Sequence, residues 1–515
     1  MLVNNFLEQS TKIRANKIAL IYQNKKYSYF DLEKAANSLA NCFIQKGLQK
    51  QDRVAIYLEN SVESIISIFG ILKSSGIFVI VNPQVKAKKA NYIFNDCNIK
   101  ILITDNKHLK EISSILCNCP DLELLVIIDK QISVENVSKF KQKIIFFDKI
   151  LAEYPAVCPL NKCNEDDLAS LIYTSGSTGS PKGVMLSHKN IVSASSSIIE
   201  YLENTDKDII LNCLPLSFDY GLYQILMSFR FGGTIVLEKN FLYPYSLIDL
   251  IIKEKITGLP IVPSIAAILL KLKNLKKYDF SNLRYITSTA QSLSPKHIKK
   301  LQEIFPKTKI YSMYGLTECK RVSYLPPEDI LLKPDSVGIA MPNVNTFIVD
   351  GNKRIITKPG KIGELVVTGC NVMKGYWNLP EETKKCLKTS SNPNVRILYT
   401  GDLFKMDDEG YLYFVSRKDD IIKTAGERVS PKEIENVLYE IEDINEAGVI
   451  GVKDEILGNA IKAFVALDKN SKITKNDIFL HCKKNLENFM IPKYIEIRER
   501  LPKTPTGKIS KKDLI

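Results

Sequence analysis

Tryptophan and histidine are scarce in this chain, whose 515 residues contain one tryptophan and four histidines. The histidines lie far apart, and the eleven cysteines include no CxxC pair, so the usual spacing of a zinc site is missing. Long apolar runs are missing too: the best candidate, "SIISIFGILKSSGIFVIV", is interrupted by Lys73. The N-terminus lacks the basic and then apolar order of a signal peptide. These absences predict a cytoplasmic protein without a membrane partner, whose cysteines are small buried residues.

Acidic residues are fewer than basic ones, and the formal net charge is +14. A basic surface attracts nucleic acid, anionic lipid or an acidic protein. The lysines are spread along the chain, however, and no arginine-rich or aromatic-interleaved patch accompanies them. We therefore expect no nucleic-acid partner, while an acidic carrier protein would suit the charge.

Short apolar runs alternate with amphipathic helical patterns over the first two thirds of the chain. This alternation predicts an α/β fold with layered parallel sheets, and the length predicts more than one domain. After about residue 340 the pattern becomes rich in strands and glycine, which favours a small β-barrel-like part. The last hundred residues read as a compact α+β unit, in which Ser430 is expected to cap a helix with Pro431 at its first position. We expect a large N-terminal domain, residues 1–418, and a small mobile C-terminal domain, residues 419–515.

The stretch "LIYTSGSTGSPKG" places many hydroxyls and glycines beside one lysine, directly after a predicted strand. Small residues leave backbone N–H groups accessible, and Lys182 adds a positive charge, so the stretch suits a polyphosphate. It is not a Walker A loop, because Gly183 follows the lysine. A flexible linker is the alternative, but "MLSHKNIVSASSSIIEYL" follows at once and reads as a helix.

The stretch "YTSGSTGSPKG" resembles the signature loop of the adenylate-forming superfamily, which contains acyl-CoA synthetases, peptide-synthetase adenylation domains and luciferases. Four later motifs resemble the same family, in the family's order: "MYGLTE", "YTGD", "SRKDDIIKTAGERVSPKEIE" and "LPKTPTGKISK". The resemblance covers nearly the whole chain and is closest to stand-alone amino-acid adenylation enzymes.

The resemblance implies that a carboxylate attacks the α-phosphate of ATP, that pyrophosphate leaves, and that the acyl adenylate then meets a thiol. Thr317 would donate to the α-phosphate, Glu318 would hold Mg²⁺, and Lys508 would bridge the carboxylate and the phosphate as the third catalytic residue. Asp419 would be the hinge on which the small domain rotates between the two half-reactions. The ATP-binding residues implied by the motifs are Thr174, Ser175, Gly176, Ser177, Thr178, Gly179, Lys182, Ser288, Tyr314, Asp402, Phe414 and Arg417.

Phe218 and Asp219 bear on the choice of acid. Adenylation domains of peptide synthetases resemble this chain in having Phe-Asp there, and the aspartate pairs with the substrate's amino group. A buried ammonium needs such a partner, although Asp219 could instead cap the helix that follows. By the same resemblance, the acid pocket is lined by Asp219, Tyr220, Tyr223, Pro260, Ile286, Met313, Arg321 and Val322.

The bulky tyrosines and methionine favour a small substrate. We expect activation of a small amino acid, with proline the best guess, and transfer to the phosphopantetheine thiol of a separate carrier protein. The alternative of the same fold is a small-carboxylic-acid CoA ligase, with coenzyme A as acceptor. A catalytically inactive nucleotide-binding regulator is a third hypothesis, but it predicts loss of Lys508, Glu318 or the phosphate loop, and all are present.

Overall fold

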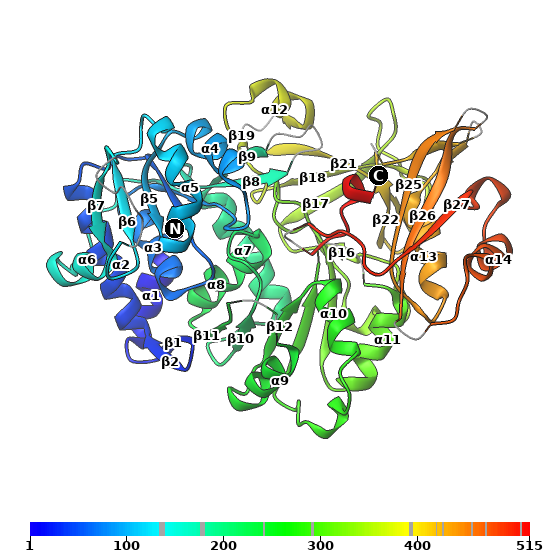
Figure 1. Ribbon diagram of the computed structural model, residues 1–515, viewed down its shortest axis with the longest axis horizontal. Coiled ribbons are helices and arrows are strands. Elements are labelled where there is room, and N and C mark those ends of the chain that lie inside the picture. Colours follow the sequence, from blue (N-terminus) through cyan, green and yellow to red (C-terminus); the bar gives the residue numbers. More distant parts are fainter. Residues whose placement is uncertain are drawn as a thin grey trace.

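The computed structural model describes residues 1–132, 140–175, 181–239, 241, 243–289, 293–390, 395–418, 420–424, 427–454, 457–468, 471–504 and 507–514. It has the mixed α/β architecture expected from the sequence, with a large N-terminal part and a small C-terminal one (Figure 1). The C-terminal part, coloured orange to red, lies at the opposite end of the molecule from the first sheet, in blue and cyan.

The first sheet has eight strands, and its central strands are parallel because helices cross over between them. Its last two strands in chain order, β9 and β19, run antiparallel to their neighbours. In spatial order the strands are β19 (Gly375–Tyr376), β9 (Pro181–Ser187), β8 (Leu168–Ser175), β4 (Ile77–Ile80), β3 (Arg53–Tyr57), β5 (Ile99–Thr104), β6 (Leu124–Ile127) and β7 (Lys143–Phe146).

The second sheet has nine strands and is parallel from β14 to β1. In spatial order they are β16 (Ile339–Ala340), β15 (Ser323–Tyr324), β14 (Lys309–Tyr314), β13 (Tyr285–Ser288), β12 (Gly258–Ile261), β10 (Ile209–Asn212), β11 (Thr234–Leu237), β1 (Ile18–Tyr22) and β2 (Lys25–Ser28). The carboxyl ends of β12, β13 and β14 lie side by side, which is where parallel sheets commonly bind ligands.

The predicted strand-rich part is an antiparallel five-stranded sheet, and the small domain has a three-stranded sheet of its own. The five strands are β17 (Val344–Val349), β18 (Gly363–Gly369), β20 (Leu387–Thr389), β21 (Arg396–Met406) and β22 (Leu412–Arg417). A short pair, β23 (Ile422–Thr424) and β24 (Glu427–Val429), precedes β25 (Ile444–Asp454), β26 (Gly458–Leu467) and β27 (Tyr494–Arg498).

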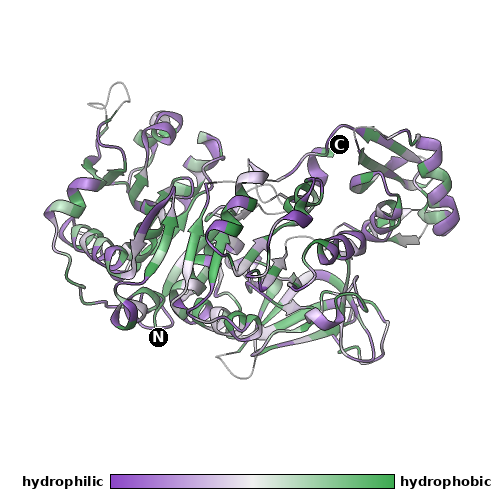
Figure 2. Cartoon of the chain, turned by 90° about the horizontal axis from the view of Figure 1, so that it is seen from below, coloured by the Kyte–Doolittle hydropathy of each residue, from purple (hydrophilic) through white to green (hydrophobic). Residues whose placement is uncertain are grey.

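Helices cover the sheets and turn their apolar faces toward them. Figure 2 shows that the most hydrophobic segments are the strands beneath these helices. In chain order they are α1 (Asn5–Arg14), α2 (Tyr29–Gln45), α3 (Val62–Lys73), α4 (Ala87–Asp96), α5 (Asn106–Ile112), α6 (Phe147–Glu153), α7 (His188–Leu202), α8 (Asp219–Phe231), α9 (Pro244–Lys253), α10 (Pro263–Leu270), α11 (Pro295–Ile304), α12 (Pro380–Cys386), α13 (Pro431–Glu440) and α14 (Lys475–Asn485). None of the helices in the described ranges has the length and hydropathy needed to cross a membrane.

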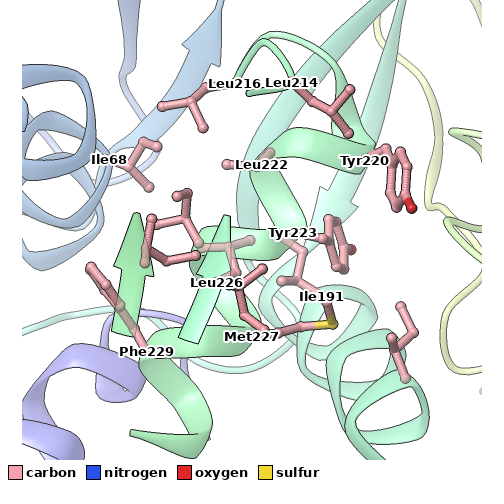
Figure 3. Packing of buried hydrophobic residues seen from close by; sticks show 14 of the residues in the cluster. Ile68, Ile191, Leu214, Leu216, Tyr220, Leu222, Tyr223, Leu226, Met227 and Phe229 are labelled. Atoms are coloured by element: carbon pink, nitrogen blue, oxygen red, sulfur yellow. The ribbon is translucent and has the colours of Figure 1, made fainter. Parts of the chain in front are cut away.

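Helix α8 packs against strands β10 and β11 of the second sheet and belongs to the same hydrophobic cluster as α3. Figure 3 shows Leu222 and Leu226 directed toward Ile68 of α3, while Tyr220 and Tyr223 leave the helix on another side. All of α8 up to Phe229 is buried, so its tyrosines lie inside the molecule and not on its surface.

Two sequence-based expectations differ in detail. The helix expected from Met185 begins only at His188, and residues 181–187 form strand β9, in which Val184 and Leu186 are buried and Met185 between them is less buried. Ser430 does occupy the N-cap of α13, but its hydroxyl donates to the carbonyl of Val415 and makes no capping bond.

Candidate active site

The predicted phosphate loop connects β8 and β9. Register places Thr174 opposite Lys182, so the two ends of the loop meet. Gly176, Ser177, Thr178 and Gly179, and the side chain of Ser175, lie outside the described residues. The Lys182 ammonium lies 2.7 Å from the Glu382 carboxylate of α12 and 5.3 Å from the centre of the Tyr376 ring.

The segment after β14 forms a tight turn that presents Glu318. A Cβ atom on Gly315 would lie 2.3 Å from the carbonyl oxygen of Lys320, so only glycine fits there. The Glu318 carboxylate accepts a hydrogen bond of 2.8 Å from the Tyr376 hydroxyl. Thr317, partly buried, precedes it in the same turn.

Asp402, in the middle of β21, forms a second group with Tyr314 and Arg417, the last residues of β14 and β22. The Tyr314 hydroxyl donates to Asp402 at 2.7 Å, and Arg417 Nε lies 3.3 Å from the other carboxylate oxygen. Burial raises the pKa of Asp402, and Arg417 opposes that rise. The Phe414 ring lies 6.4 Å from the ring of Tyr314. The Asp402 carboxylate can accept hydrogen bonds from ribose hydroxyls, and the neighbouring aromatic rings can contact a base, so this group suits a nucleoside.

Lys508 reaches this group from the small domain. Burial lowers the pKa of Lys508, Arg417 lowers it further, and Asp219, Asp402 and Glu318 oppose the change. Gly507, at φ +82°, packs against α10 so closely that a Cβ atom would lie 2.9 Å from the Ser264 hydroxyl. The predicted hinge, Asp419, lies outside the described residues.

Asp219 is buried, as expected for a pocket residue, but it already has a cationic partner. The ammonium of Lys320 lies 3.5 Å from its carboxylate, and both side chains are less than a tenth exposed. Asp219 is the first residue of α8 and makes no capping hydrogen bond, so the capping alternative is not observed. Lys320 adopts a left-handed backbone, φ +55°, which a lysine adopts only at a cost.

The residues predicted to line the acid pocket divide between two faces of the sheet. Register pairs Pro260 with Thr287, and the Tyr220 hydroxyl contacts the Thr287 hydroxyl at 2.6 Å. Ile286 pairs with Leu259, so Ile286 and Ser288 point to the opposite face. The remaining residues, all buried, are Tyr223, Met313, Arg321 and Val322. Arg321 lies 5.2 Å from the centre of the Tyr220 ring.

Sequence analysis missed three residues that contact the site: Lys320, Tyr376 and Glu382. Lys320 directly follows "MYGLTEC" and could have been noticed as a charge in a buried turn. Tyr376 and Glu382 lie in segments without a recognisable motif, and only the pairing of β19 with β9 brings them to the phosphate loop.

The fold, the paired ends of the phosphate loop and the convergence of Lys508 with Glu318 and Asp402 define an AMP-forming ligase. Residues 7–377 match the AMP-binding enzyme family, and residues 433–508 match the AMP-binding enzyme C-terminal domain. The chain belongs to the AMP-binding enzyme family.

Its relatives include enzymes of both kinds considered above. A long-chain-fatty-acid–CoA ligase of Bacillus subtilis is 32% identical over 100% of this chain and 94% of its own length. Gramicidin S synthase 2 of Brevibacillus brevis is 29% identical over 99% of this chain, which spans 11% of that protein. Among solved structures, the anthranilate CoA ligase AuaEII with anthranoyl-AMP is 27% identical, with a TM-score of 0.90 over 100% of this chain and 96% of that one.

Proposed function

We propose that this enzyme is an AMP-forming ligase that joins a carboxylic acid to coenzyme A. The observation that carries the proposal is the ion pair between Asp219 and Lys320. A carboxylate that already faces a buried ammonium does not need the amino group of a substrate. The similarity to CoA ligases over the full chain supports the same choice.

Amino-acid activation is the second candidate. The Phe218-Asp219 pair and the similarity to gramicidin S synthase 2 favour it. It would need Lys320 to leave Asp219 or to lose its proton; burial lowers the pKa of Lys320 to about 7. No contact in the described part of the pocket points to proline.

In the first half-reaction, an oxygen of the acid's carboxylate attacks the α-phosphorus of ATP and the bond to pyrophosphate breaks. Lys508 would hold the carboxylate and the α-phosphate, whose like charges otherwise repel each other. Thr174 and Lys182 would bind the leaving phosphates, Thr317 the α-phosphate and Asp402 the ribose hydroxyls. Tyr314 and Phe414 would contact the adenine.

Glu318 fits a magnesium ion, because its carboxylate is a hard oxygen ligand and Mg²⁺ is commonly held by one or two carboxylates plus phosphate oxygens. Bound there, the ion would neutralise phosphate charge. The Tyr376 hydroxyl holds the orientation of that carboxylate.

In the second half-reaction, the thiolate of coenzyme A attacks the acyl carbonyl and AMP leaves with the electron pair of the broken bond. Lys508 would have to withdraw to admit the thiol, so we propose rotation of the small domain near residues 418–419. The boundary between the two domains at this position stays a prediction.

The test is exchange of labelled pyrophosphate into ATP with separate panels of amino acids and non-amino carboxylic acids, followed by assay of the CoA ester. We expect non-amino acids to stimulate exchange and to yield the ester. Lys508→Ala should slow exchange about 100-fold or more, as loss of a group that stabilises transition-state charge does. Lys512→Ala, in the same tail, is the matched control. Exchange stimulated by amino acids alone would refute the proposal.

A further inference from the structure

Arg321 is the most deeply buried cation of the site. It is 2% exposed, it lies in the turn between β14 and β15 beside Tyr220 of α8, and its Nε atom is buried without a hydrogen-bond partner. In the described part of the chain, no carboxylate forms a salt bridge with its guanidinium. Its visible partner is the face of Tyr220, 5.2 Å from the guanidinium carbon. A permanently charged group in this state is costly unless an anion reaches it.

The neighbouring charges leave Arg321 uncompensated. Asp219 already faces Lys320, whose ammonium also lies 4.4 Å from the centre of the Tyr223 ring. Asp219 acts electrostatically on Lys508 as well as on Lys320, and Arg321 acts on Lys320. Asp219 therefore attracts both Lys508 and Lys320, whereas Arg321 has no salt bridge with a carboxylate of the described residues.

The turn that carries Arg321 is held in place from behind. The amide of Asn371 donates to the carbonyls of Cys319 at 2.6 Å and of Arg321 at 3.0 Å. The backbone that carries Arg321 is therefore held in place before any substrate arrives, which lowers the entropic cost of binding an anion.

We propose that the enzyme activates a dicarboxylic acid, whose distal carboxylate pairs with Arg321 while its other carboxylate reacts beside Lys508. The inference rests on the proposed function and names its substrate class. The planar guanidinium fork matches a carboxylate in two parallel hydrogen bonds.

The experiment compares mono- and dicarboxylic acids of equal carbon number in ATP–pyrophosphate exchange: propanoate with malonate, butanoate with succinate, and hexanoate with adipate. We expect the best diacid to exceed its matched monoacid on the order of 100-fold in kcat/KM, as expected for a charge-assisted buried bond. Arg321→Met should abolish this preference and Arg321→Lys should keep part of it. Arg230→Met, which removes an arginine that contacts Phe6 outside the pocket, is the control and should leave the ratio unchanged.

The outcomes separate the two proposals. A wild-type enzyme that uses monoacids as well as diacids, or an unchanged ratio in Arg321→Met, overturns this inference and leaves the CoA ligase in place. Exchange with no acid of either panel overturns the proposed function and the inference with it. If Arg321→Met does not fold, Arg321→Lys and the wild-type ratio decide, because a purely structural arginine would not affect the choice between matched acids.

Discussion

Lys320 shows what local sequence patterns predict about single residues and what they miss. The motifs around Glu318 and Lys508 are local, so the sequence predicts that these residues belong to one site. The partner of Asp219 lies on a distant segment, and no spacing rule connects the two. The sequence predicts that Asp219 pairs with a substrate amino group, and this role stays a prediction; the structure adds an ammonium of the chain itself, that of Lys320, 3.5 Å from the carboxylate.

Removing one partner of the Asp219–Lys320 pair should destabilise the fold. Lys320→Met leaves a buried carboxylate without its partner and should lower the free energy of unfolding by about 3 kcal/mol. The double variant, Asp219→Asn with Lys320→Met, should recover most of that loss. Urea unfolding of the four proteins in a double-mutant cycle measures the coupling, and additive effects would contradict the pair.

His188 should make the fold sensitive to mild acid. Burial lowers its pKa to about 4, and its Nδ1 accepts a hydrogen bond from the backbone of Val3. The unfolded chain binds a proton below about pH 6.5, whereas the folded chain does so only near 4. Stability is therefore fully present above about 6.5 and falls as the pH drops toward 4, by about 2 kcal/mol at pH 5.

His188→Asn tests this, because the amide oxygen can replace Nδ1 as acceptor. Between about pH 7.5 and pH 5, the variant should lose about 2 kcal/mol less stability than the wild type in urea unfolding. Equal losses would show that His188 is not the acid-sensitive group.

Helix α8 illustrates prediction at the scale of an element. The sequence predicts a helix after Asp219, and α8 is that helix with Asp219 as its first residue. The apolar pattern cannot predict how closely helix α8 approaches the loop that precedes it. Strand β9 escaped prediction because its apolar residues Val184, Met185 and Leu186 lead directly into the helical pattern of α7.

Gly221 sets the approach of α8 to that loop. A Cβ atom there would lie 2.4 Å from the carbonyl oxygen of Pro215 and 2.8 Å from that of Leu214. Gly221→Ala must displace the helix, so we expect a loss of about 1–3 kcal/mol and a higher KM for the acid, because Tyr220 moves too. Gly351→Ala, where no atom lies within 4 Å, is the control. Thermal unfolding and exchange kinetics measure both effects.

At the scale of the whole molecule, long side chains make polar contacts between the large and small domains. Lys271 lies 3.3 Å from Asp468, and the Lys296 ammonium donates to the carbonyl of Glu442 at 2.5 Å. The length and the change in pattern along the sequence predict two domains, but such surface pairs depend on the docked arrangement and on long side chains. No sequence pattern specifies them.

These contacts should favour adenylation over thioester formation. The double variant Lys271→Glu with Lys296→Glu replaces attraction by repulsion, and we expect exchange to slow several-fold because each exposed pair contributes up to about 1 kcal/mol. Thioester formation from supplied acyl adenylate should be unaffected. Stopped-flow or quench measurements of each half-reaction test this, and equal slowing of both would contradict it.

The pairing of Lys182 with Glu382 has a consequence for how the nucleotide enters. The triphosphate must compete with a carboxylate supplied by the protein itself, so binding is a replacement of one anion by another and not a simple capture by a bare cation. Weakly charged nucleotides such as AMP would compete poorly for this lysine. Once the adenylate has formed, the Glu382 carboxylate would compete with the bound pyrophosphate for Lys182 and so help that product to depart.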